Sequence, residues 1–151
     1  MSAFGLTGED TIMLDSRILA DFADADYGKI EFPNDIVDVK TSKNGNVLIG
    51  DKASGSLMHL TLRVVLGSPD DKYMNSRLLE QRSDLPAFKA VTASITTRSG
   101  DGSGSVSAIT YQAVAGVFKK IPGAVSNSEG SGDQAVAVYE LTFGSAPRSI
   151  A

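Results

Sequence analysis

The segment "SLMHLTLRVVL", residues 56–66, alternates apolar side chains with more polar ones along its whole length. A period of two over a stretch of this length predicts a β-strand with one face in a hydrophobic core. The apolar face comprises Met58, Leu60, Leu62, Val64 and Leu66. The opposite face is mixed rather than polar, which indicates partial cover by another part of the protein. The segment therefore predicts a protein built on β-sheet.

Three later segments repeat this alternation: residues 90–98, 106–120 and 134–145. Their apolar positions are Val91, Ala93 and Ile95 in the first; Ile109, Tyr111, Ala113, Ala115 and Val117 in the second; and Ala135, Ala137, Tyr139, Leu141 and Phe143 in the third. The glycine-rich "SGDGSGS" at residues 99–105 suits a hairpin connection between the first two. These segments predict three more strands.

Two hairpins are predicted before residue 56. Residues 10–22 read as a short strand pair that turns near Asp15 and Ser16. Farther along, Asn44-Gly45 is a strong two-residue turn signal between strand-like flanks, which predicts a long hairpin over residues 37–52.

One helix is predicted, in "SPDDKYMNSRLLEQRSDLP" at residues 68–86. Ser68 suits the N-cap, Pro69 suits the first helical position, and the two aspartates that follow suit the positive end of the helix dipole. Met74 and Leu78 are one turn apart and are expected to face inward. The order of elements predicts an antiparallel β-sandwich or barrel with one flanking α-helix.

Length and composition fit one domain over residues 1–151, with flexible terminal arms expected at residues 1–10 and 144–151. The chain has no cysteine, which excludes disulfides and thiolate metal ligands and suggests folding in a reducing cytosol. It shows no apolar run long enough for a membrane span, and no secretory signal is expected. Its 14 basic and 18 acidic residues give a net charge of −4, which argues against tight nucleic-acid binding.

No catalytic, cofactor or metal site is predicted. His59 is the one histidine and lies in the middle of a predicted strand, where a packed histidine is more common than a catalytic one. The loop with Gly100, Gly102 and Gly104 is followed by a strand rather than by the helix that phosphate loops need. The acidic residues 21–28 lack the spacing of a calcium loop and are interpreted as a solvated turn.

A resemblance to a known family rests on several short motifs. One is "FKKIP" at residues 118–122, followed by a polar loop and by "YELTF" at residues 139–143. Another is the turn "SKNGN" at residues 42–46. Comparable strand-to-helix positions are held by Gly55, Leu57, residues 60–62, Ser68, Pro69 and Asn75. In these features the chain resembles the tail tube proteins of contractile-tailed bacteriophages.

The resemblance implies a structural, non-enzymatic role without a cofactor. In that family six copies close into a ring, rings stack, and inward-facing sheets merge around a lumen that conducts the genome into the host. The partners implied are further copies of the chain, a tail sheath protein, and baseplate and tape-measure proteins. DNA is met only in transit, without sequence-specific binding. The implied location is the virion tail, assembled in the host cytoplasm; the inner tube of type VI secretion systems shares this architecture.

Two sets of contact residues are expected on this basis. The predicted hairpin is the candidate for stacking onto the next ring, through Val39, Thr41, Lys43, Asn44, Gly45, Asn46 and Val47. The candidate lumen-facing residues are Thr92, Ser94, Thr96 and Arg98. An ordinary surface hairpin and an ordinary exposed sheet face remain the alternatives. The net negative charge also suits a channel through which DNA slides, because phosphate is repelled.

A small ligand-binding β-sandwich without catalysis is the main alternative function. The absence of tryptophan and an aromatic content of 7% argue against stacking on sugars. A hydrolase of unfamiliar design lacks candidate residues. Assembly state separates the tube hypothesis from both alternatives.

Overall fold

The computed structural model describes residues 6–7, 10–22, 28–125 and 135–151. The strands are β1 Leu6–Thr7, β2 Thr11–Leu14, β3 Arg17–Ile18, β4 Gly28–Glu31, β5 Val37–Thr41, β6 Val47–Asp51, β7 Met58–Val65, β8 Val91–Gly100, β9 Val106–Phe118, β10 Gly123–Val125, β11 Val136–Ser145 and β12 Arg148–Ile150. The helix α1 spans Pro69–Ser83, and the short 3₁₀ turns η1 and η2 span Ala53–Ser56 and Leu85–Ala87.

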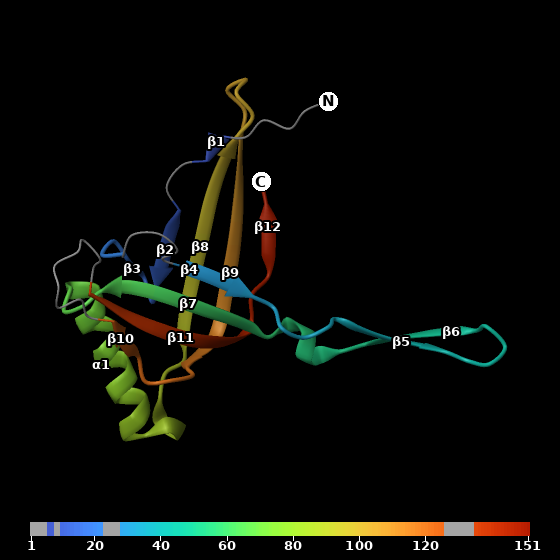
Figure 1. Cartoon of the computed structure of the whole chain (residues 1–151), viewed down its shortest axis with the longest axis horizontal. Coiled ribbons are helices and arrows are strands. Elements are labelled where there is room, and N and C mark those ends of the chain that lie inside the picture. Colours follow the sequence, from blue (N-terminus) through green and yellow to red (C-terminus); the bar gives the residue numbers. More distant parts are fainter. Residues whose placement is uncertain (1–5, 8–9, 23–27, 126–134) are drawn as a thin grey trace.

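Ten of these strands form one antiparallel sheet in the order β3-β2-β8-β9-β11-β7-β4, with β1 on β8, β10 on β11 and β12 on β9. Strands β7 and β11 run across the direction of β8 and β9 (Figure 1). Buried side chains from both groups of strands and from α1 belong to one hydrophobic core. The β-sandwich with one flanking helix that the sequence predicts is therefore confirmed.

The alternation in β7 is confirmed side chain by side chain. Met58, Leu60, Leu62 and Val64 are all buried, whereas Leu66 lies beyond the end of the strand and is exposed. In β11 the predicted inward set is likewise buried, apart from Ala135, which precedes the strand. The buried members are Ala137, Tyr139, Leu141 and Phe143.

Strand β9 departs from the predicted alternation at Ala115. The sequence pattern puts Ala113, Ala115 and Val117 on one face, but the structure buries Ala113, Gly116 and Phe118. Ala115 has a φ of 58°, and the register against β8 shifts by one residue at this point. A β-bulge adds one residue to one strand and so reverses which side chains face inward. The prediction for Ala115 and Val117 was wrong for this reason.

We expect Gly116→Ala to destabilise the protein by about 1–3 kcal/mol, the usual cost of overpacking a core. Gly116 lies opposite Phe143, and a Cβ there would meet the Phe143 ring and stand 2.7 Å from the carbonyl oxygen of Val91. Urea unfolding measures the change. Gly123→Ala is the matched control, because a Cβ at Gly123 meets nothing within 4 Å. Equal urea midpoints for the two variants would contradict the prediction.

Helix α1 has the predicted start and cap, and it ends at Ser83, inside the predicted segment. The Ser68 side chain accepts a hydrogen bond from the Asp71 backbone N–H at 3.3 Å. Met74 and Leu78 are buried in the core, as their spacing predicts. Residue Asp84 then ends the helix in an extended conformation.

The C-terminal segment differs from the arm without strand structure expected at residues 144–151. Strand β11 continues to Ser145, and β12 pairs with β9 through Arg148–Ile150. Ala151 and Ala108 exchange two further backbone hydrogen bonds. In the expected N-terminal arm β1 pairs with β8, and residues 1–5 and 8–9 lie outside the described part. No helix among the described residues is long and apolar enough to cross a membrane.

Candidate assembly surfaces

The β5–β6 hairpin extends far from the rest of the molecule (Figure 1). Its strands pair only with each other, and every residue in both strands is exposed. The tip is a loop closed by a hydrogen bond from Ser42 N–H to the Asn46 carbonyl, with Gly45 at a φ of 83°. The expected turn is present, but three residues rather than two bridge the closing pair, because Gly45 takes the left-handed position that ends such a loop.

The register of the hairpin puts most of its apolar side chains on one face, which we call the apolar face and which carries Asp51 only at its base, opposite Val37. Val39 pairs with Ile49 and Thr41 pairs with Val47, so these side chains share one face. On the other face Asp38 lies opposite Gly50, and Lys40 opposite Leu48. Val39 is 56% exposed and Ile49 is 67% exposed. The predicted stacking residues thus lie together on the outer half of the hairpin, with Val39, Thr41 and Val47 on the apolar face and the others in the tip loop.

The candidate lumen residues lie on the outward face of β8. Thr92, Ser94, Thr96 and Arg98 alternate with the buried Val91, Ala93 and Ile95. The structure therefore brings the predicted set together on one face, while their position in a lumen stays a prediction.

A row of hydroxyl groups crosses this face over four strands. Thr11, Thr96, Thr110 and Ser149 stand side by side on β2, β8, β9 and β12. The Thr96 and Thr110 Oγ1 atoms are 3.4 Å apart, and one row away Gln112 Nε2 donates to Ser94 Oγ at 3.4 Å. Sequence reasoning found the β8 members but missed the row, because only the strand register reveals it.

The charge of this face is not that of the whole chain. Among the residues of β2, β8, β9 and β12 that share it, Arg98 is the only charged one. The chain as a whole has a net charge of −4, but β2, β8, β9 and β12 contain no acidic residue. The expectation of an acidic wall derived from net charge therefore does not hold for this face.

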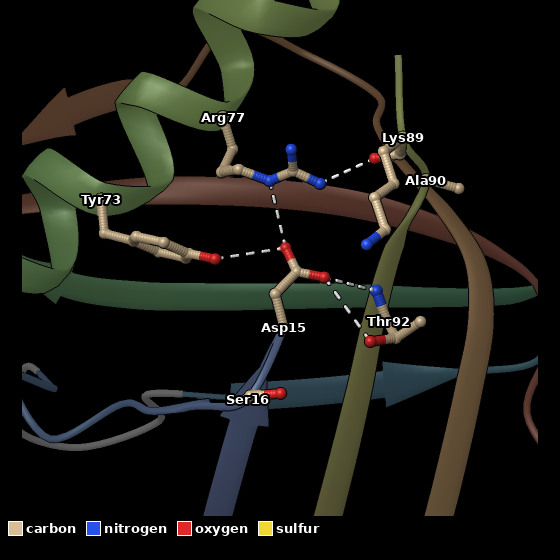
Figure 2. A pocket seen from close by; sticks show the side chains of 7 residues that line it. All are labelled: Asp15, Ser16, Tyr73, Arg77, Lys89, Ala90 and Thr92. Atoms are coloured by element: carbon tan, nitrogen blue, oxygen red, sulfur yellow. Dashed lines mark hydrogen bonds and ion pairs between the residues drawn. The ribbon is translucent and has the colours of Figure 1, made fainter.

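A hollow of about 360 Å³ lies beside the turn between β2 and β3. Figure 2 shows the residues around it, with the Asp15 carboxylate at their centre. Asp15 accepts hydrogen bonds from Tyr73 Oη at 3.3 Å, Arg77 Nε at 3.1 Å and Thr92 N–H at 3.0 Å. Burial, and then the negative charge of Asp15, raise the pKa of Tyr73, so the phenol remains a donor.

Arg77 makes several further contacts beside this hollow. It donates to the carboxylate of Glu80 at 2.6 Å and to the carbonyl of Lys89 at 2.7 Å, and its guanidinium lies 4.8 Å from the centroid of the Phe88 ring. These contacts join α1 to the β2–β3 turn and to β8. We interpret Asp15, Tyr73 and Arg77 as a structural contact between these elements, because the Asp15 carboxylate and the Arg77 guanidinium are already bonded within the chain.

Within the described ranges no three His, Cys, Asp or Glu side chains are grouped as metal ligands. His59 is half-buried on β7, as its position in a strand predicts. Most of the acidic turn at residues 21–28 lies outside the described residues.

Three solved structures are similar over nearly the whole chain. A chain of the sheath–tube complex of an extracellular contractile injection system (PVC, extended state) matches with a TM-score of 0.62 and 11% identity, covering 94% of this chain and 88% of that one. The sheath/tube terminator of PVC in the extended state matches with a TM-score of 0.60 and 13% identity, covering 93% of this chain and 92% of that one. The tube-terminating cap of the anti-feeding prophage matches with a TM-score of 0.58 and 13% identity, covering 94% of this chain and 88% of that one.

This chain has the fold of contractile injection system components. The tail-tube resemblance in the sequence is thereby confirmed at the level of the fold. No protein-family model and no curated protein matches the sequence. The coverage of 88% or more of each similar chain means that the likeness extends over whole subunits rather than over a shared motif.

Proposed function

We propose that this protein is the structural tube subunit of a contractile tail or injection machine. In this proposal six copies form a ring and the rings stack into a hollow tube, which lies inside a sheath and starts from a baseplate. The tube length is set by a tape-measure protein, and the genome passes through the lumen. The observation that carries the proposal is the exposed β5–β6 hairpin on a fold shared with sheath–tube components.

The hairpin supports stacking for a physical reason. An isolated two-stranded hairpin is marginally stable in water, and contiguous exposed apolar surface marks an interaction site. Val39, Val47 and Ile49 expose such a surface on one face, well away from the core. A second copy of the chain is the partner that a repeating assembly supplies at every hairpin.

The outward face of β8 and β9 supports a lumen role. Its hydroxyl row is polar but uncharged, and among the described residues of β8 and β9 that share this face Arg98 is the one cation. Affinity for DNA depends on many Lys and Arg contacts with phosphate. A wall of this composition holds a passing polyanion weakly, which suits transit.

A tube terminator is the second candidate, because two of the similar structures are a terminator and a terminating cap. In this second proposal the chain forms a ring at a tube end and does not polymerise. The small ligand-binding module has weaker support, because the Asp15 carboxylate and the Arg77 guanidinium at the centre of the hollow already bind each other and neighbouring groups of the chain.

Negative-stain electron microscopy of the purified protein over a concentration series tests the proposal. We expect rings or stacked tubes with a central hole, either spontaneously or after a baseplate nucleus is added. Isolated rings that never stack, even on a nucleus, would favour the terminator. A monomer that persists with the nucleus present would refute both.

A further inference from the structure

The base of the β5–β6 hairpin is a close backbone contact around Gly55. Gly55 is buried, although it lies in the 3₁₀ turn η1 directly after the hairpin. A Cβ at Gly55 would stand 2.7 Å from the carbonyl oxygen of Asp35, 2.7 Å from the Cα of Ile36 and 2.8 Å from the Cγ2 of Ile36. The segment that enters the hairpin therefore packs on the turn that follows it, with no room for a side chain.

Two hydrogen bonds join the segment before β5 to the segment after β6. Asn34 Nδ2 donates to the carbonyl of Ser54 at 3.1 Å. The Lys52 N–H donates to the carbonyl of Ile36 at 2.9 Å, which closes the hairpin at its base. The segments before β5 and after β6 are thus bonded to each other at the base of the hairpin.

A third hydrogen bond fixes the turn to the body of the protein. Ser56 Oγ donates to the carbonyl of Gly144 in β11 at 2.9 Å. Strands β4 and β7, which lead into and out of this region, are themselves paired from Gly28–Leu62 to Glu31–His59. We call the contact of residues 34–36 with residues 54–56 the hairpin lock.

We propose that the hairpin lock sets the direction in which the β5–β6 hairpin leaves the body, and that Gly55 is the positioning residue for ring-to-ring assembly. The inference rests on the proposed stacking role of the hairpin. Strands β5 and β6 pair only with each other, so the lock, anchored to β11 by the Ser56–Gly144 hydrogen bond, holds the base of the hairpin against the body. A small change in angle at the base becomes a large displacement at the tip, where the next ring must be met.

The test compares Gly55→Ala with Gly50→Ala. Gly50 lies in β6, and a Cβ there meets nothing within 4 Å, so this variant is a matched control in the same hairpin. The chain has no cysteine, so Lys43→Cys at the tip and Arg82→Cys on α1 can carry two spin labels. Pulsed electron resonance then measures the tip-to-body distance in each background, and unlabelled proteins are used for assembly.

We expect the wild type and Gly50→Ala to give the same narrow distance distribution and to form tubes. Gly55→Ala should give a shifted or broadened distribution and no tubes, with a circular dichroism spectrum like that of the wild type. Asn34→Ala removes only the bond to Ser54 and decides the question if Gly55→Ala does not fold; we expect it to broaden the distribution and reduce tube formation. If a folded Gly55→Ala or Asn34→Ala variant gives the wild-type tip-to-body distances, the proposal that the lock sets the hairpin direction is wrong.

Failure of the proposed function has a different signature. If the wild type forms neither rings nor tubes on a nucleus, the stacking role is wrong, and the distance measurement alone decides whether the lock orients the hairpin. If Gly55→Ala changes the distances but still forms normal tubes, the lock exists without a role in assembly, and the positioning proposal is rejected.

Discussion

Ile49→Asp is expected to abolish tube formation while the subunit stays folded. Ile49 is 67% exposed on the apolar face of the hairpin, so the aspartate is well solvated in the free subunit. In a stacked ring the same carboxylate would be buried against an apolar surface without a partner, which costs several kcal/mol per contact. The cost recurs at every copy around the ring. Electron microscopy, with circular dichroism to establish folding, measures the result.

Leu48→Asp is the matched control for this prediction. Leu48 is 75% exposed and adjacent in sequence, but it lies on the face that carries Asp38 and Lys40. We expect this variant to retain tubes, because that face stays in water. Normal tubes from Ile49→Asp would show that the apolar face of the hairpin makes no stacking contact.

Asp70→Ala is expected to lower the free energy of unfolding by about 1.5–3 kcal/mol, the usual contribution of hydrogen bonds to a charged group. The Asp70 side chain is 2% exposed. Its carboxylate accepts hydrogen bonds from Arg17 Nε at 3.0 Å and from the backbone N–H groups of Ala20 and Asp21 at 2.6 and 2.8 Å. The alanine variant leaves all three donors without this acceptor. Urea unfolding at pH 7 measures the loss.

Asp38→Ala is the control, because Asp38 forms only an exposed ion pair with Lys40 at 3.9 Å, and such pairs contribute little. We expect a change below about 1 kcal/mol for this variant. A similar small change for Asp70→Ala would contradict the structural role of its carboxylate.

The contribution of Asp70 should also depend on pH. Burial raises the pKa of Asp70, but hydrogen bonds from Asp21, Ala20 and Arg17 outweigh it and hold the pKa below its ordinary value of 3.8. A lowered pKa in the folded state means that the stabilisation is complete above pH 3.8 and is lost as the pH falls through the folded-state value. The stability difference between the wild type and Asp70→Asn should therefore shrink below pH 3.8.

Sequence patterns predicted the elements whose signals are local. The period of two in β7 and β11, the cap and proline that begin α1, and the turn at Asn44-Gly45 each depend on residues close together in the chain. Such patterns also placed the candidate stacking and lumen residues on exposed faces. They were wrong for Ala115, because a bulge breaks the alternation without a local signal, and they missed β12, whose three residues are too few to show a period.

The sequence by itself determined the long strands, where the helix begins, and that one hairpin is rich in apolar side chains. Only the tertiary structure decided which residues meet across the sheet. The hydroxyl row joins Thr11 to Ser149, Asp70 binds a segment 49 residues away, and Gly55 packs on Ile36. The physical reason is that periodicity reports the face of a residue within its own element. Register, bulges and backbone packing are set by contacts between segments far apart in the chain.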